Sequence, residues 1–196
     1  MYTQDPAFWR AGAISSSAVM FVVLVVLSID SVRAIRAGGS HVPRYDVINR
    51  NIGYGFDSAR NEDVPIIQGE DLLFNRHYTE AEATRLLAKG KLVIQSRACI
   101  DCHTFFGNGA YYGPDLTKAW LDPIWTAWGP MYGAKRRDQA MVDFLMHPER
   151  FPLGNRTMPN LGISEDEARA VVAYLKWMSA VDANGFPAGF LSANAR

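Results

Sequence analysis

The feature that most constrains this chain is a pair of cysteines three positions apart, followed at once by a histidine. Cys99, Cys102 and His103 form the pattern Cys-x-x-Cys-His, and the 196 residues contain no other cysteine. A disulfide across so short a loop would stabilise little, because its entropic gain grows with loop length. The pattern is instead that of covalent haem attachment, in which each thiol adds to one vinyl group and the histidine becomes the first iron ligand.

Two other uses of the cysteine pair are weaker. A thioredoxin-like redox pair needs a strand–helix context, whereas the residues before Cys99 have a helical, amphipathic pattern. A zinc site would need further ligands, and the remaining histidines, His41, His77 and His147, are scattered. The sequence therefore favours one covalent haem c.

The second axial ligand of such a haem should lie downstream, and methionine is the usual choice where the potential is fairly positive. Met158 is the strongest candidate, because it lies in a turn-rich loop and Pro159 favours an extended backbone there. Met131 and His147 are the alternatives. The other downstream methionines lie on predicted helices, where core packing is their default role: Met141, Met146 and Met178.

The N-terminal segment is apolar enough to cross a membrane. Ala11 to Ile29 is a run of 19 uncharged residues, and a helix of that length spans roughly 28 Å, about the thickness of the hydrocarbon core. We predict a retained transmembrane anchor at residues 11–32, after a cytoplasmic N-terminus at residues 1–10. A cleaved signal peptide is the alternative, although its apolar stretch would be shorter and its start more basic.

Two signals disagree about the orientation of this anchor. Arg33, Arg36 and Arg44 follow it and only Arg10 precedes it, which by the positive-inside rule would leave the C-terminal domain in the cytoplasm. The haem motif predicts the opposite side, because c-type haem is attached outside the cytoplasmic membrane in bacteria. Since long domains translocate with little regard to nearby charge, we expect a single-pass inner-membrane protein with its C-terminal domain in the periplasm.

The residues after the anchor predict a connector and then a helical domain. Residues 33–78 are rich in Gly, Asn, Asp, Arg and Pro and predict an irregular or weakly extended connector. Thr79 and Glu82 form a capping box that begins the first helix of the domain. Gly90 on this helix should allow a close crossing with the C-terminal helix at Tyr174 and Trp177.

Two further helices are expected. One runs from about Arg137 to Met146 and is stopped by Pro148. The other begins at a second capping box, formed by Ser164 and Glu167. Helices at both ends with irregular chain between them indicate an all-α fold, in which residues 79–196 form a class I-like mono-haem cytochrome c domain. The charge balance, 20 basic and 20 acidic residues, gives no case for nucleic-acid binding.

The chain from Cys99 to Leu116 is Cys-Ile-Asp-Cys-His-Thr-Phe-Phe-Gly-Asn-Gly-Ala-Tyr-Tyr-Gly-Pro-Asp-Leu. It resembles the small cytochrome c subunit of bacterial nitric oxide reductase, which carries His-Thr-x-x-Gly-x-Gly-Ala-Tyr-x-x-Pro-Asp/Glu-Leu-like sequence after its haem motif. The anchor, the polar connector and the Met-Pro loop before a last helix also match, so the resemblance covers nearly the whole chain. The segment from Trp120 to Phe151 departs from it.

The resemblance implies a non-catalytic electron-transfer subunit of an oxidoreductase complex. Its partner would be a large polytopic subunit with a low-spin haem b and a catalytic haem b/non-haem iron pair, in a membrane of the denitrifying respiratory chain. This chain would accept electrons from a soluble periplasmic cytochrome c or cupredoxin. It would pass them to the low-spin haem b for the reduction of two nitric oxide to nitrous oxide and water. The resemblance also implies an interface calcium that contacts the Gly109 carbonyl and Tyr111.

Other assignments share part of this pattern. A mono-haem subunit of a cbb-type oxygen reductase would have the anchor and the haem motif, but the Gly-Asn-Gly-Ala-Tyr continuation is not expected there. A stand-alone membrane-tethered electron shuttle is the second alternative. The aromatic residues Trp120, Trp125, Trp128 and Tyr132 either pack around the haem edge or contact a partner, since aromatic rings often anchor interfaces.

Overall fold

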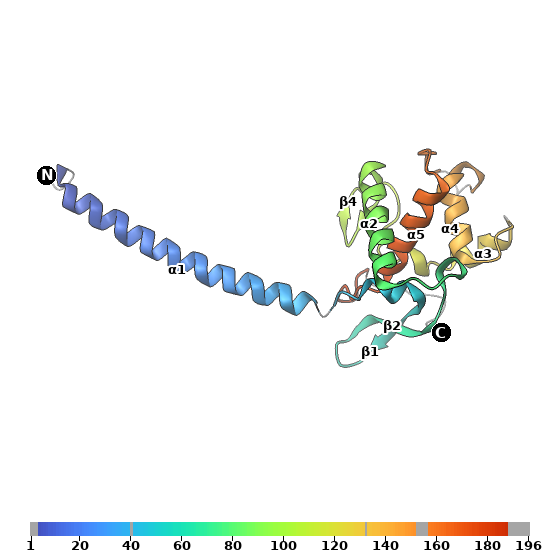
Figure 1. Ribbon diagram of the computed structural model, residues 1–196, viewed down its shortest axis with the longest axis horizontal. Helices are drawn as coiled ribbons and strands as arrows, with labels where there is room; N and C mark the ends of the chain where they lie inside the picture. The colour runs from blue at the N-terminus through green and yellow to red at the C-terminus, as the bar shows by residue number, and fades with distance from the viewer. Residues whose placement is uncertain (1–3, 40, 132, 152–156, 188–196) are drawn as a thin grey trace. The chain divides into compact units, whose positions relative to one another are not determined.

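The computed structural model describes residues 4–39, 41–131, 133–151 and 157–187. They fall into two compact units, Met1–His41 and Val42–Arg196. The first unit contains helix α1 (Pro6–Gly39), shown in blue in Figure 1. Its segment Pro6–Ile35 is long and apolar enough to cross a membrane. The helix therefore extends past residues 11–32 at both ends, because the flanking alanines and arginines are good helix formers.

Four helices shape the second unit (Figure 1). Helix α2 (Glu80–Ser96) packs against α5 (Glu165–Ser179), α4 (Arg137–Met146) packs against α5, and α3 (Ile124–Met131) packs against α4. Both predicted capping boxes are confirmed, at the start of α2 and of α5. The mostly helical architecture confirms the predicted fold class.

The crossing of α2 and α5 depends on Gly90. A methyl group at this position would lie 2.7 Å from the carbonyl carbon of Ala170 and 2.9 Å from Cβ of Tyr174, both far inside normal contact distance. The two backbones can therefore approach closely only because residue 90 has no side chain. Buried apolar residues of both helices, including Leu87 and Val171, fill the core beside this contact.

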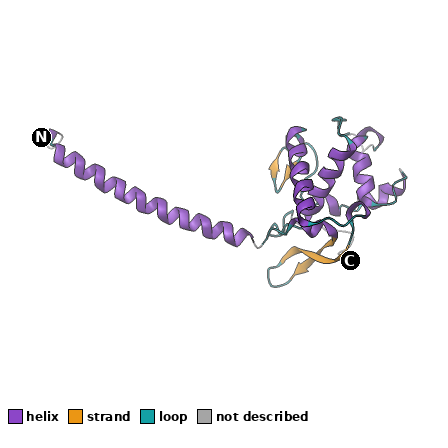
Figure 2. Cartoon of the chain, in the orientation of Figure 1, coloured by secondary structure: helices purple, strands orange, loops and turns teal. Residues whose placement is uncertain are grey.

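Residues 50–70 of the connector are extended, so the expectation of irregular chain is wrong there. Strands β1 (Arg50–Asp57) and β2 (Glu62–Glu70) form an antiparallel hairpin in which Ile52 lies opposite Ile67, drawn in orange in Figure 2. Ile52 and Tyr54 are buried in the core of the second unit. The alternation of apolar residues was obscured in the sequence by Gly53, Gly55 and Pro65, which are all poor strand formers.

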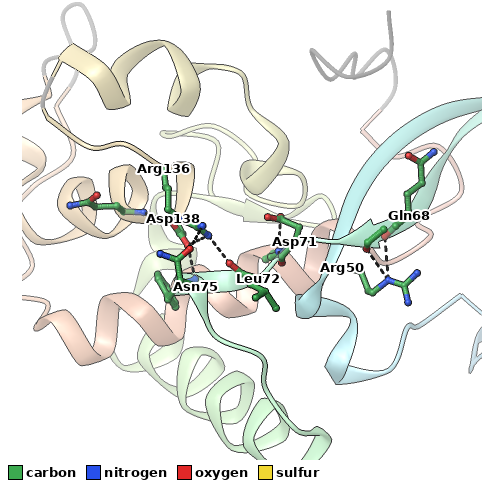
Figure 3. Close-up of polar contacts among 11 residues, drawn as sticks. Arg50, Gln68, Asp71, Leu72, Asn75, Arg136 and Asp138 are labelled. Atoms are coloured by element: carbon green, nitrogen blue, oxygen red, sulfur yellow. Dashed lines mark hydrogen bonds and ion pairs between the residues drawn. The ribbon is translucent and has the colours of Figure 1, made fainter.

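The chain after the hairpin is fixed by buried charges (Figure 3). Lys176 donates to the carboxylate and the carbonyl of Asp71, both at 2.8 Å. Arg136 donates to the carbonyl of Leu72 at 2.6 Å and to Asp138, whose carboxylate also accepts from the Phe74 N–H at 2.6 Å. Although burial acts to raise the pKa of Asp138, these hydrogen bonds lower it below its ordinary value. The predicted connector is thus part of the folded domain.

Short elements complete the second unit. Two two-residue strands, β3 (Thr104–Phe105) and β4 (Asn108–Gly109), pair antiparallel just after the cysteine motif. Five 3-10 turns occur in the described part of the second unit: Tyr45–Asn49, Leu73–Asn75, Cys99–Asp101, Ala119–Leu121 and Pro148–Arg150.

Candidate functional site

The cysteine motif begins where α2 ends. Arg97 caps the helix, and Ala98 then adopts a left-handed conformation with φ 53°, a position that glycine usually occupies after a helix. This residue turns the chain into the 3-10 turn Cys99–Asp101. The backbone N–H of His103 then donates to the Cys99 carbonyl at 2.9 Å, so both cysteines and the histidine belong to one hydrogen-bonded turn.

Both thiols are free and half-buried. Cys99 packs against the hydrophobic core, and this burial raises the pKa of its thiol, with a smaller contribution from Cys102. The turn therefore holds both thiols, with Cys99 at the edge of an apolar core. An apolar edge of this kind suits covalent attachment of a large, flat, apolar group.

His103 is oriented through its Nδ1 atom, which lies 2.8 Å from the carbonyl oxygen of Pro114. A carbonyl can only accept, so Nδ1 donates this hydrogen bond, and in the neutral ring Nε2 then keeps its lone pair. Gly113 lies against the ring: a methyl group there would be 2.5 Å from Cε1 and 2.6 Å from Nδ1. This is how a metal-binding histidine is commonly held, with one nitrogen bonded to the protein and the other available to the metal.

The loop that carries Pro114 is anchored next to the motif and just after the end of α5. The Gly113 N–H donates to the Cys102 carbonyl at 2.6 Å. At the other end Lys118, which is 2% exposed, donates to the Val181 carbonyl at 2.8 Å and lies over the Tyr54 ring at 4.5 Å. Burial lowers the pKa of Lys118 to about 8. The position of the Pro114 carbonyl is thus fixed by contacts well outside the motif.

Met158 is half-buried and packs against the hydrophobic core. The loop after it is held on two sides: Arg97 donates to the Leu161 carbonyl at 3.2 Å, and Asn160 donates to the Glu149 carboxylate at 3.1 Å. The pairing of Met158 with His103 on one iron stays a prediction.

Arg97 is a site residue that sequence reasoning missed. Its guanidinium binds Glu167 through Oε1 at 2.9 Å and Oε2 at 3.0 Å, so it joins the end of α2 to the start of α5. The Ser164 N–H and then Arg97 lower the pKa of Glu167 to about 2. The only sequence signal was a basic residue two positions before Cys99, which does not reveal a partner seventy residues away.

The other candidates for the second iron ligand are His147 and the remaining downstream methionines. His147 Nδ1 lies 3.5 Å from Glu149. Met141 and Met178 are buried in the core and Met146 packs against it, as expected for packing residues. The side chain of Met131 lies outside the described residues.

Two of the four aromatic residues singled out in the sequence have packing roles. Trp120 is buried beneath Arg137 and Lys176, whose charged groups lie 5.3 and 4.8 Å from the ring centre. Trp125 donates from Nε1 to the Ala119 carbonyl at 2.7 Å and packs edge-on against Phe144. The side chain of Trp128 and all of Tyr132 lie outside the described residues.

The two residues expected near calcium lie in the turn after the motif. Gly109 has φ +125°, and a methyl group there would be 2.9 Å from the Ile100 side chain, so the turn needs glycine. The Tyr111 hydroxyl donates to the Gly107 carbonyl at 3.1 Å, and its ring is 80% exposed. The described residues contain no cluster of three or more His, Cys, Asp or Glu side chains.

Comparison with known proteins agrees with this site. Residues 87–179 match the cytochrome c family model. The C subunit of nitric oxide reductase from Stutzerimonas stutzeri is 29% identical over 58% of this chain and 73% of its own length. The protein of the same name from Paracoccus denitrificans is 27% identical over 55% of this chain and 69% of its own length. The one from Halomonas halodenitrificans is 22% identical over 59% of this chain and 73% of its own length. Residues 87–179 are therefore similar to cytochrome c, and the chain as a whole is similar to the C subunit of nitric oxide reductase.

Proposed function

We propose that this chain is the electron-entry subunit of a membrane nitric oxide reductase. One haem c is attached to Cys99 and Cys102, with His103 and Met158 as its axial ligands. The chain accepts electrons from a soluble periplasmic cytochrome c or cupredoxin and passes them to the low-spin haem b of a large catalytic subunit. The anchor is α1, and the domain that follows it is periplasmic.

The observation that carries this proposal is the way the protein holds the ring of His103. Its ring is held through Nδ1 by the Pro114 carbonyl and lies against Gly113, and it follows two free thiols on the same turn. Bound haem c supplies reversible one-electron chemistry at its iron. The similarity to the nitric oxide reductase C subunits of three organisms supports a complex with a catalytic subunit.

The residues of this chain would have separate roles in binding the haem and restricting it to electron transfer. His103 and Met158 would fill both axial positions, which leaves no vacant position for nitric oxide and restricts the chain to electron transfer. A thioether ligand favours the reduced iron and raises the potential. Cys99 packs against the hydrophobic core, so the attached group would lie against an apolar surface.

An interface calcium is part of the same proposal. The Gly109 carbonyl and Tyr111 would each contact the ion, because calcium binds oxygen ligands. Since the described residues hold no carboxylate cluster, the large subunit would supply the remaining ligands. Metal analysis of the purified complex tests this: we expect one calcium per complex and less in Tyr111→Phe. Equal calcium in both preparations would remove Tyr111 from the site.

The main test is purification of the chain from its native membrane. We expect it to co-purify with a large subunit, with one haem c for every two haems b, and to consume nitric oxide with a periplasmic donor. A preparation without haem b would refute the reductase assignment and favour the stand-alone shuttle. Oxygen reduction without nitric oxide reduction would favour an oxygen reductase assignment.

The axial methionine is tested in the same preparation. In Met158→Ala we expect loss of the methionine-to-iron charge-transfer band, a lower haem c potential, and slower nitric oxide consumption with the soluble donor. Met141→Leu is the matched control, because Met141 is buried in the core at 2% exposure and should leave the band intact. Retention of the band in Met158→Ala would transfer the ligand role to Met131 or another residue.

A further inference from the structure

Asp115 links the loop that orients His103 to the residue that follows His103. Its Oδ2 accepts from the Thr104 hydroxyl at 2.7 Å, and its Oδ1 accepts from the Thr117 N–H at 2.8 Å. Thr104 and Thr117 are almost fully buried, at 2% and 0% exposure. Both oxygens of one carboxylate are therefore used between two buried threonines.

Backbone hydrogen bonds also join the loop at residues 113–116 to the chain on either side of His103. The Gly113 N–H donates to the Cys102 carbonyl at 2.6 Å, and the Leu116 N–H donates to the Thr104 carbonyl at 2.8 Å. The contact between His103 Nδ1 and the Pro114 carbonyl lies between these two backbone hydrogen bonds. Any change in the spacing of the two segments therefore changes the length of that contact.

The Thr104–Asp115 hydrogen bond differs from these backbone bonds because its acceptor is a carboxylate. Hydrogen bonds to ionised acceptors are shorter and roughly twice as strong as neutral ones. The Thr117 hydroxyl adds a second tie, because it accepts from the Phe106 N–H at 2.7 Å. The loop is thereby attached to both ends of the segment from Thr104 to Phe106.

We propose that Asp115 is a positioning residue for the proximal histidine, and that it acts through Thr104 to set the strength of the His103–Pro114 hydrogen bond. This inference rests on the proposed role of His103 as an iron ligand. A histidine whose Nδ1–H is firmly bonded is a more basic ligand at Nε2, and a more basic ligand favours ferric iron. Asp115 would thus hold down the potential of the haem.

A purely local role for Asp115 makes a different prediction. Its bond to the Thr117 N–H is an Asx turn, which Asp and Asn form widely in loops. Asp122 forms the same turn, since its Oδ1 accepts from the Ile124 N–H at 2.9 Å. The Asx turn does not require the bond to Thr104, eleven residues earlier, and that bond is what distinguishes the two roles.

The experiment is a redox titration of haem c in the full-length chain, purified with its partner subunit. In Thr104→Val we expect the ferric–ferrous equilibrium to shift about tenfold toward ferrous, which matches the lower end of outer-shell effects on metal affinity and is a rise of about 59 mV for one electron. Thr104→Ser keeps the hydroxyl and should restore the parent potential. Asp122→Ala, which removes a similar Asx turn, should leave the potential unchanged.

Asp115→Asn gives a second measurement that does not depend on Thr104→Val folding. It keeps the Asx turn and loses the carboxylate at Thr104, so its potential should rise in the same direction. Equal potentials in the parent, Thr104→Val and Asp115→Asn would overturn the proposal and leave Asp115 with a local role. Absence of covalent haem c from the parent protein would instead refute the proposed function.

Discussion

Replacing Gly113 by alanine should disturb the proximal histidine without straining the backbone. The new methyl group would lie 2.5 Å from Cε1 and 2.6 Å from Nδ1 of His103. Carbon atoms in normal contact are about 3.5 Å apart, so the ring must move by about 1 Å. Gly113 is not among the residues with positive φ, so any loss of stability comes from this contact.

The cost of that movement can be worked out from its parts. A shift of about 1 Å breaks the 2.8 Å contact between His103 and Pro114, which is worth about 1 kcal/mol. Overpacking adds about 2 kcal/mol, and the lower entropy of the unfolded alanine chain offsets about 1 kcal/mol. We therefore expect the free energy of unfolding to fall by about 2 kcal/mol and the haem potential to rise.

Denaturant unfolding of the haem-loaded chain and a redox titration measure both effects. Gly69→Ala is the matched control, because nothing lies within 4 Å of a methyl group there, and it should keep the parent's potential and lose no stability. If Gly113→Ala also has the parent's stability and potential, the ring does not lie against residue 113 and the described orientation of His103 is wrong.

Three further predictions concern the rest of the domain. Gly90→Ala should lower the free energy of unfolding by about 3 kcal/mol net of its better helix propensity, measured by denaturant unfolding. The free energy of unfolding should rise between pH 8 and 10.5. Burial lowers the pKa of Lys118, which lies near Asp182 and Asp115, to about 8 in the folded chain, against an ordinary value of 10.5. Between these two values the unfolded chain binds more protons than the folded chain, so stability increases with pH. That rise, at most about 3 kcal/mol, should be absent from Lys118→Met in unfolding titrations across this range. Ser164→Ala should cost about 1 kcal/mol through the lost helix cap, with no change in the haem spectrum.

The parts of the fold that could be predicted from the sequence are those set by neighbours along the chain. Both capping boxes use residues three positions apart, and the cysteine motif occupies five consecutive positions. The length of an apolar run is also a local property, so a helix at the N-terminus was expected and is present. Gly90 was identified because it interrupts a helical stripe that needs a close neighbour.

The tertiary structure decided the contacts that join distant segments. The hairpin of residues 50–70 was missed because its strands contain glycine and proline and gain their stability by packing on the core. The pairing of Arg97 with Glu167 spans seventy positions, and nothing in the local sequence of either residue names the other.

The proximal side of the candidate haem site shows the same division. The sequence by itself determined that Cys99, Cys102 and His103 lie together, because covalent spacing allows little else. Only the folded chain showed which nitrogen of His103 is bonded, since the Pro114 carbonyl comes from a loop eleven residues later. Loops of that length have many conformations in isolation, and here Asp115 and Lys118 select one by binding partners elsewhere in the domain.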